Sequence, residues 1–372
     1  MSKRAIFEEV SETRRPVAAA PAEARAPWRR GIAIWLWLLA LLVAVMVLIG
    51  GLTRLTDSGL SITVWDPVMG AVPPLSDADW DAAFALYQQT TEFQEQNHWM
   101  TLADFKPIYW WEWGHRQFGR LIGVVWLVGF LVFLVARRIP TGWTGRLMVP
   151  GVLGGIQGFI GWWMVASGLD KLDVASYRLA THLGLAFAIF MLLTWLALKV
   201  RLDPVELLQS RRRRAGSALG WTSAMVALVF LQLLVGALVA GIDAGRSYVD
   251  WPLMQGQWFP EDALLLEPLW RNLFESSGLV QFVHRVLGYL VALVALIAAW
   301  RLAAARVPGL GTLGAAVLTA VASQVAIGIV TVIKAAPLEW AIMHQAGALV
   351  LILVLMLARF RAAYPPATRL AA

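Results

Sequence analysis

The chain has 372 residues, of which 59% are hydrophobic and only 15% charged, and its formal net charge is +7. This small number of charged side chains cannot cover the surface of a soluble domain of this length. The composition therefore excludes a soluble protein and predicts an integral membrane protein. The sequence contains no cysteine, which excludes disulfides, thiolate metal sites and cysteine nucleophiles.

The first segment, residues 1–30, is rich in Ala, Pro and Arg and has no apolar signal-peptide core. We expect it to form a disordered cytoplasmic tail. Eight apolar stretches follow, each of roughly 20 residues, which is enough to cross a hydrocarbon core of about 30 Å as a helix. The sequence therefore predicts an all-α integral membrane protein with eight transmembrane helices. They lie at 31–51, 117–136, 147–167, 176–198, 218–240, 280–302, 308–331 and 341–360.

Acidic and basic residues gather in alternate connections between these spans. The long loop at 53–113 is acidic, and we expect short helices in its segment DADWDAAFALYQQTTEF. Arginines gather in the other connections, including the run Arg211–Arg214 of the linker at 202–217. A second acidic loop includes Asp243, Asp250 and Glu275. By the positive-inside rule both termini are cytoplasmic and these two long loops face outward. Membrane topology, rather than nucleic-acid binding, therefore explains the net charge.

The spans before and after the linker form two similar halves. The segment YWWEWGHRQFGRLIG around His115 resembles LVQFVHRVLGYLVAL around His284, and His182 in ATHLGLAF corresponds to His344 in IMHQAGALV. Because four spans are an even number, both halves insert in the same orientation. We therefore expect two tandem pseudo-symmetric four-helix bundles. The predicted parts are the N-terminal half at 31–201, the linker at 202–217, the C-terminal half at 218–361 and a cytoplasmic tail at 362–372.

These four histidines lie near the outer ends of the even-numbered spans. Two imidazoles from facing helices of a bundle form a well-suited axial pair for haem iron, so we expect one haem in each half. Zinc needs three or four ligands, and each half repeats only two histidines. The alternative is a polar histidine that forms hydrogen bonds where two helices meet. This alternative accounts for any one of the four histidines, but it accounts poorly for two matched pairs. The fifth histidine, His98, has no counterpart and is expected to be solvated.

Other residues near the histidines support a macrocycle. Arg116 and Arg285 each follow a predicted ligand and are placed to pair with haem propionates, with snorkelling to the headgroups as the alternative. Glycines follow each histidine by about one turn or less and leave room for a flat ring, although glycines are also common where membrane helices meet. These glycines are Gly119, Gly184, Gly288 and Gly347.

One difference between the halves suggests chemistry. Glu112 precedes His115 by three residues, so on a helix both face the same direction, whereas the second half has Gln281 in that place. A carboxylate beside only one of two haems suggests one catalytic and one supporting site. The alternative is a helix-end carboxylate that suits the helix dipole.

Six motifs are specific in combination: GGLTRLTDSGLSI, FKPIYWWEWGHRQFGRLIG, THLGLAF, DAGRSYVDWPLMQGQWFP, QFVHRVLGYL and MHQAGALV. Through them the chain resembles haem A synthases of the cysteine-free type of proteobacteria and mitochondria, over nearly all of residues 31–360. The resemblance implies an eight-helix inner-membrane enzyme that oxidises the C8 methyl group of haem O to a formyl group by successive hydroxylations, giving haem A for terminal oxidases. The cysteine pairs in the outer loops of other branches are absent here.

The resemblance also implies roles for the site residues. His115 and His182 are associated with the substrate haem, His284 and His344 with a haem b cofactor, and Glu112 matches the catalytic glutamate. Implied partners are haem O synthase and a ferredoxin-like electron donor. From the residues themselves, the basic run Arg211–Arg214 is a hypothetical docking site for an acidic donor, and a homo-oligomer is left open.

Two other functions remain open from the residues alone. A bis-histidine dihaem b-type cytochrome that only transfers electrons explains the histidines and the duplication, but not the difference between Glu112 and Gln281. A transporter built from parallel repeats requires a polar path across the membrane. Gln157 and Gln324 are the exceptional polar residues within the spans, and we expect them to form interhelical hydrogen bonds.

Overall fold

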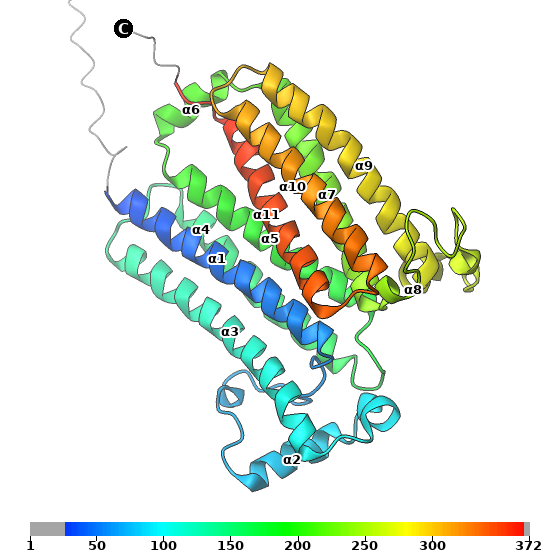
Figure 1. Cartoon of the computed structure of the whole chain (residues 1–372). Helices are drawn as coiled ribbons and strands as arrows, with labels where there is room; N and C mark the ends of the chain where they lie inside the picture. The colour runs from blue at the N-terminus through cyan, green and yellow to red at the C-terminus, as the bar shows by residue number, and fades with distance from the viewer. Residues whose placement is uncertain (1–26, 368–372) are drawn as a thin grey trace, which may run out of the picture.

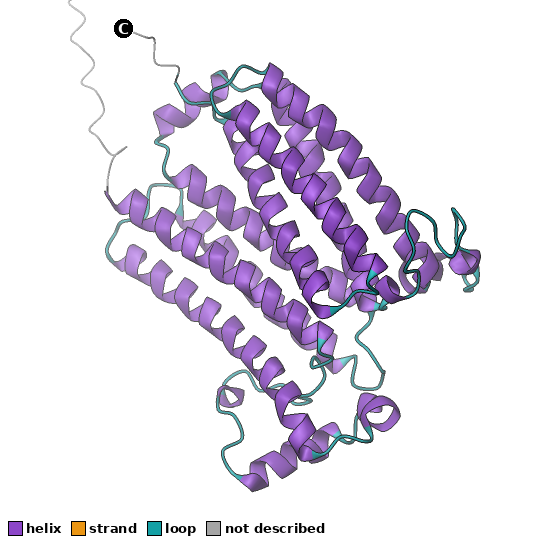
Figure 2. Ribbon diagram, viewed as in Figure 1, coloured by secondary structure: helices purple, strands orange, loops and turns teal. Residues whose placement is uncertain are grey.

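The computed structural model describes residues 27–367, and within this range it consists of helices and loops without a β-strand (Figure 2). Eight of the helices are long and apolar enough to cross a membrane, which confirms the predicted all-α membrane fold and its eight spans. They are α1 (Pro27–Leu55), α3 (Leu102–Val135), α4 (Thr144–Ala166), α5 (Ser176–Val200), α7 (Gly216–Gly241), α9 (Ser277–Ala304), α10 (Leu310–Ile333) and α11 (Leu338–Ala363).

Three shorter α-helices lie in the connections: α2 (Asp77–Tyr87), α6 (Pro204–Arg212) and α8 (Asn272–Glu275). Helix α2 confirms the helix expected in the first long loop, and a capping box formed by Ser76 and Asp79 begins it. Helix α6 lies in the basic linker, where Asp203 caps it and proline occupies the first turn. Figure 1 shows α2 and α8 at one end of the bundle, called the loop end below, and α6 at the other.

Two predicted boundaries are wrong. Residues 27–30, assigned to the disordered tail, form the first turn of α1. This turn is held against α5, because Arg29 Nη1 donates to the main-chain oxygens of Val200 and Leu202, both at 3.2 Å. These two bonds cap the end of α5. Helix α3 begins at Leu102, within the predicted loop at 53–113. Its 34 residues span about 51 Å, so it extends well beyond a hydrocarbon core of about 30 Å. The rest of the predicted tails, 1–26 and 368–372, lies outside the described residues.

Each half closes a ring of four helices. In the first half α1 and α4 both contact α3 and α5, and in the second half α7 and α10 both contact α9 and α11. The halves meet where α5 contacts α7 and α11, and where α1 contacts α11. The tandem pseudo-symmetry stays a prediction, which this order of contacts supports.

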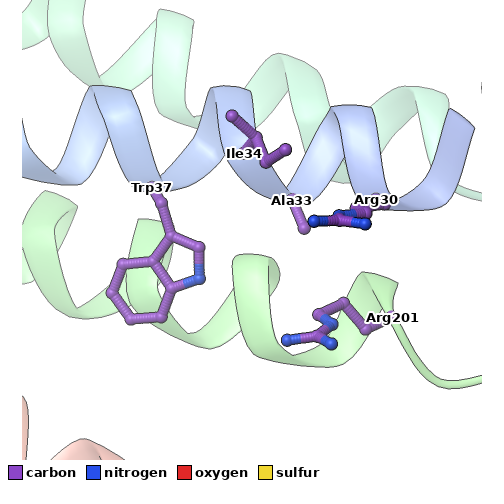
Figure 3. A pocket seen from close by; sticks show the side chains of 5 residues that line it. All are labelled: Arg30, Ala33, Ile34, Trp37 and Arg201. Atoms are coloured by element: carbon purple, nitrogen blue, oxygen red, sulfur yellow. The ribbon is translucent and has the colours of Figure 1, made fainter.

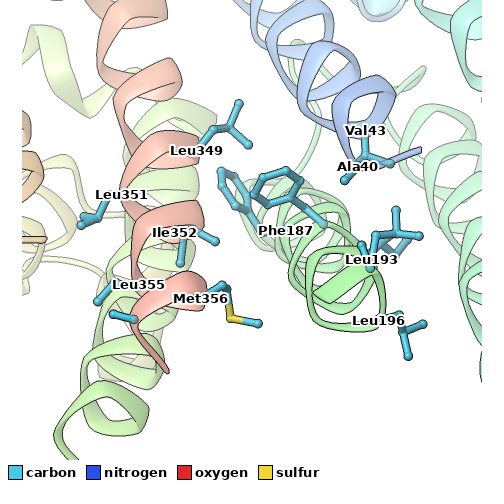
Figure 4. Packing of buried hydrophobic residues seen from close by; sticks show 14 of the residues in the cluster. Ala40, Val43, Phe187, Leu193, Leu196, Leu349, Leu351, Ile352, Leu355 and Met356 are labelled. Carbon is cyan, nitrogen blue, oxygen red and sulfur yellow. The ribbon is translucent and has the colours of Figure 1, made fainter. Parts of the chain in front are cut away.

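The main hydrophobic core lies where α1, α5 and α11 meet (Figure 4). Phe187 of α5 and Ile352 of α11 are 0% exposed there. In the most apolar stretch of α5, 56% of residues are buried, against 6% in α3 and in α4. Helix α5 is therefore central, whereas α3 and α4 present apolar side chains outward, as a lipid-facing helix does.

Polar contacts also join the halves at the loop end. Arg54 at the end of α1 forms an ion pair with Asp243 after α7, Nη2 to Oδ2 at 2.7 Å. Gln345 of α11 donates from Nε2 to the main-chain oxygen of Val47 in α1 at 2.7 Å. These bonds fix the two rings against each other close to the histidines.

A pocket of about 290 Å³ opens at the opposite end, between α1 and α5 (Figure 3). Arg30, Trp37 and Arg201 line it, together with Ala33 and Ile34. It lies several helical turns from Gly50, where α1 meets the histidines, and so it is separate from the site described next.

Candidate active site

The first histidine of each half packs against a glycine of the neighbouring helix. A Cβ atom on Gly50 of α1 would lie 3.3 Å from Nε2 of His115, which belongs to α3. A Cβ atom on Gly236 of α7 would lie 3.0 Å from Cε1 of His284, which belongs to α9. Both distances are shorter than an ordinary van der Waals contact, so a larger residue at either position would displace the imidazole.

The second histidine of each half has the same kind of neighbour. A Cβ atom on Gly161 of α4 would lie 3.0 Å from Cε1 of His182, and one on Gly328 of α10 would lie 2.9 Å from Cε1 of His344. Sequence reasoning missed these four glycines, since they are on other helices than the histidines. The glycines it selected instead pack against other helices: Gly119 lies by Met46, Gly184 by Leu234, Gly288 by Gln232 and Gly347 by Gln324.

The second-half pair has the spacing that a haem iron requires, and each half has a buried histidine nitrogen without a hydrogen bond within the described residues. The ring centroids of His284 and His344 are 6.4 Å apart, a separation that suits two imidazoles binding one metal ion at about 2 Å each. In the described part of the chain, the buried Nδ1 atoms of His182 and His344 make no hydrogen bond. Buried ring nitrogens without a protein partner are uncommon and mark positions where a bound group satisfies them.

Glu112 holds the loop that follows α1. Its side chain is 3% exposed, and its Oε2 accepts hydrogen bonds from Ser61 Oγ at 2.8 Å and from the Ile62 main-chain N–H at 2.6 Å. Its Oε1 forms an ion pair with Arg116 Nη2 at 2.6 Å. Glu112 and His115 lie on one continuous helix, as expected. The buried carboxylate is thus fully paired, which is what keeps a charge at such a depth.

Arg116 and Arg285 both bind loop carbonyls. Arg116 donates to the main-chain oxygens of Ile62 at 2.6 Å and Val64 at 3.0 Å. Arg285 donates to those of Tyr248 and Leu253, both at 2.9 Å. Each arginine therefore holds the loop of its own half against the histidine helix, and the pairing with propionates stays a prediction.

The first half has further contacts between this loop and α3. Arg120 donates from Nε to the Pro67 oxygen at 3.0 Å and from Nη2 to the Asp66 oxygen at 2.9 Å. Gln117 donates to the Gly70 oxygen at 3.2 Å. These contacts cover the first-half site with an ordered loop.

Comparisons with known proteins agree with this arrangement. Residues 33–356 match the sequence profile of a family described as "Cytochrome oxidase assembly protein". A "Heme A synthase" of Ruegeria pomeroyi is 54% identical to the chain, covering 99% of it and 98% of the relative. One of Paracoccus denitrificans is 50% identical, covering 98% of the chain and 97% of the relative. The chain belongs to the haem A synthase family.

Membership of the haem A synthase family confirms the resemblance seen in the six motifs. Of the predicted site residues, the structure brings Glu112, His115 and Arg116 together on α3, and it places His284 beside His344. His98 is exposed, as expected, and lies outside this arrangement.

One further cation of this haem A synthase family member was missed from the sequence. Arg178 lies on α5, one turn before His182, with its guanidinium 4.6 Å from the ring centroid of Trp163. Within the described residues its buried Nε and Nη1 atoms make no hydrogen bond. The corresponding position of the second half is Trp340, so this cation occurs only in the half that carries Glu112.

A buried polar cluster stabilises the covering loop beyond α2. Tyr87 donates its hydroxyl to Glu92 Oε1 at 3.1 Å, and Asn97 Nδ2 donates to the Tyr87 oxygen at 2.8 Å. Burial raises the pKa of Glu92 to about 7, and the charges of Asp57, Asp173 and Glu112 act in the same direction. Glu92 is therefore an ionisable group of the loop that titrates near neutral pH.

Proposed function

We propose that this chain is a haem A synthase that oxidises the C8 methyl group of haem O to a formyl group. Two successive hydroxylations, each of which consumes dioxygen, two electrons and two protons and releases water, give a geminal diol, and this diol loses a further water to leave the aldehyde. The observation that carries this proposal is the presence of two matched histidine pairs that differ three residues before the first histidine, where the first half has the carboxylate Glu112 and the second half has Gln281. Family membership over nearly the whole chain supports it.

The first half is the substrate half in this proposal, with His115 and His182 holding the haem O iron. Glu112 lies one turn from His115, where its charge can stabilise positive charge that develops on the substrate, or its carboxylate can accept a proton. Arg116 and Ser61 hold that carboxylate in one orientation. Arg178 provides a cation for a substrate carboxylate beside His182.

The second half holds haem b between His284 and His344. When bound, haem b supplies electrons for the reaction. The chain's own contribution there is to bury and orient the two imidazoles, because Gly236 and Gly328 leave them room and Arg285 holds the covering loop. Gln281 in place of Glu112 adds no charge beside this haem.

The proposed setting is the inner membrane, with both termini cytoplasmic and the haem sites near the outer face. The acidic long loops and basic linker support this orientation. The four arginines Arg211–Arg214 are exposed, which suits an acidic ferredoxin-like donor. Haem O synthase and a second copy of the chain are further proposed partners.

The experiment is haem extraction and chromatography from membranes of cells that supply haem O. With the intact chain we expect haem A. With Glu112→Ala we expect both haems to stay bound while haem O or its hydroxylated form accumulates. An intact chain that binds haem b in both halves and forms no haem A with a competent donor would instead establish the electron-transfer cytochrome.

A further inference from the structure

Three of the four histidines accept a hydrogen bond at their main-chain oxygen from a glutamine of a neighbouring helix. Gln157 Nε2 donates to the His182 main-chain oxygen at 3.0 Å, and Gln324 Nε2 donates to that of His344 at 2.7 Å. The interhelical bonds expected for these two glutamines are therefore confirmed. Each glutamine lies one turn before the glycine that packs against the same histidine, Gly161 or Gly328.

The third contact occurs at the first histidine of the second half. Gln232 of α7 donates from Nε2 to the His284 main-chain oxygen at 2.9 Å, and it too lies one turn before the packing glycine, Gly236. The helical carbonyl of His284 thus accepts a second hydrogen bond from a neighbouring helix. This bond fixes the main chain of the histidine against the helix that contacts its ring.

His115 is the exception. The residue one turn before its packing glycine, Gly50, is Met46. Met46 occupies the same place as Gln232: its Cε would lie 3.4 Å from a Cβ on Gly119, and Gln232 Nε2 would lie 3.6 Å from a Cβ on Gly288. Methionine and glutamine are similar in length, but the thioether has no N–H to donate. Within the described residues, no side chain donates to the His115 main-chain oxygen.

We propose that Met46 is a positioning residue. Because it donates no hydrogen bond to the His115 main chain, it leaves His115 free to move, whereas the hydrogen bond from Gln157 keeps His182 in place. This inference rests on the proposed function, since it concerns the iron of the substrate haem. An iron held firmly by two imidazoles has no free position for another ligand. A site whose chemistry needs a free coordination position requires one histidine that stays in place and one that can move away, whereas an electron carrier requires two histidines that stay in place.

The neighbouring contacts agree with this asymmetry. Helix α3, which carries His115, is the least buried of the helices together with α4, while α5, which carries His182, is the most buried. Glu112 and Arg116 attach α3 to the covering loop, so a displacement of α3 moves this loop as well as the contact to α1, where Trp35 Nε1 donates to the Val125 main-chain oxygen at 3.0 Å. Because fewer residues of α3 than of α5 are buried, a displacement of the helix that carries His115 disturbs fewer packed residues than a displacement of the helix that carries His182.

Carbon monoxide binding to the reduced, purified full-length protein tests the inference, with optical spectra as the readout. We expect one of the two haems to bind carbon monoxide in the wild type. Met46→Gln should lower the carbon monoxide affinity about fivefold, the ratio that roughly 1 kcal/mol from one hydrogen bond gives. Met46→Leu, which removes the sulfur without adding an amide, should bind carbon monoxide as the wild type does.

The second half offers the converse variant. Gln232→Met should make the second haem accessible to carbon monoxide, and it tests the inference even where Met46→Gln does not fold. Haem content gives a further readout: His115→Ala should retain the first-half haem more than His182→Ala does.

The inference is overturned if neither wild-type haem binds carbon monoxide, if Met46→Gln binds it like the wild type, or if Met46→Leu lowers the affinity equally. Failure of the proposed function is a separate result, because it appears as the absence of haem A whatever the carbon monoxide spectra show.

Discussion

The main-chain N–H of Ile62 donates to Glu112 at 2.6 Å, whereas at the corresponding place of the second half the main-chain oxygen of Tyr248 accepts from Gln281 at 3.0 Å. In both halves a hydrogen bond therefore joins the loop to the histidine helix, but the loop is the donor in the first half and the acceptor in the second. The acid accepts from the loop and so brings a negative charge next to His115. The amide ties the loop without a charge.

Replacement of Glu112 by glutamine removes the negative charge but keeps a hydrogen-bond acceptor for the loop, so it separates these two roles of the side chain. Glu112→Gln keeps the size of the side chain and one acceptor for Ile62, but Arg116 loses its ion pair. We expect haem A formation to fall by roughly 10²- to 10⁴-fold, the usual loss for a positioned acid or base, while both haems stay bound. Haem chromatography and the haem-to-protein ratio measure the two effects.

Ser61→Ala is the matched control for that substitution. It removes one donor to Oε2 and leaves the charge of Glu112 and its pairing with Arg116 intact. The loss of activity should be much smaller than for Glu112→Gln. Equal losses would mean that the loop contact, and not the charge, is what the reaction requires.

The packing glycines predict a second effect, on haem binding. In Gly236→Val the new side chain would meet His284, since even a Cβ atom would lie 3.0 Å from its ring. We expect loss of the second-half haem, so that the haem-to-protein ratio falls by about half, as the pyridine haemochrome spectrum measures. Gly220→Ala on the same helix is the control, because a Cβ there meets nothing within 4 Å. Retention of both haems in Gly236→Val would contradict the placement of the imidazole.

Much of this arrangement follows from sequence patterns, and the part that does not has a common physical reason. Hydropathy predicted all eight spans, and the duplicated histidines predicted the pairing of His284 with His344. The glycines that pack against the rings, and Gln232, were not predicted because a contact between helices has no local period in the sequence. The carbonyl partners of Arg116 were missed for a related reason: they belong to irregular backbone, whose path depends on the folded chain.

Arg178 predicts an effect on substrate binding rather than on the chemical step. Arg178→Ala removes a half-buried cation near His182 whose buried Nε and Nη1 atoms make no hydrogen bond within the described residues. We expect the KM for haem O to rise about tenfold, equivalent to roughly 1.4 kcal/mol, with kcat nearly kept. Arg178→Lys should restore part of the affinity, because the charge returns without the planar fork. A fall in kcat with an unchanged KM would assign Arg178 to the reaction itself.

The buried cluster around Glu92 predicts that the covering loop responds to pH. Burial raises the pKa of Glu92 from 4.5 to about 7, so the folded loop binds this proton more tightly than the unfolded chain does. Loop stability is then fully present below about pH 4.5 and falls as the pH rises to about 7, by roughly 3 kcal/mol in total.

Limited proteolysis of the intact membrane protein measures this response. Cleavage between α2 and α3 should be faster at pH 8 than at pH 5.5, after correction for the protease's own pH dependence. Glu92→Gln keeps a hydrogen-bonding partner for Tyr87 and removes the titrating group, so its cleavage rate should change little over this range. Asp79→Asn is the control, because that carboxylate caps α2 in solvent and its pKa is lowered by the Ser76 side chain rather than raised. Equal pH dependence in the wild type and Glu92→Gln would show that another group controls the loop, since only Glu92 loses its charge in that variant.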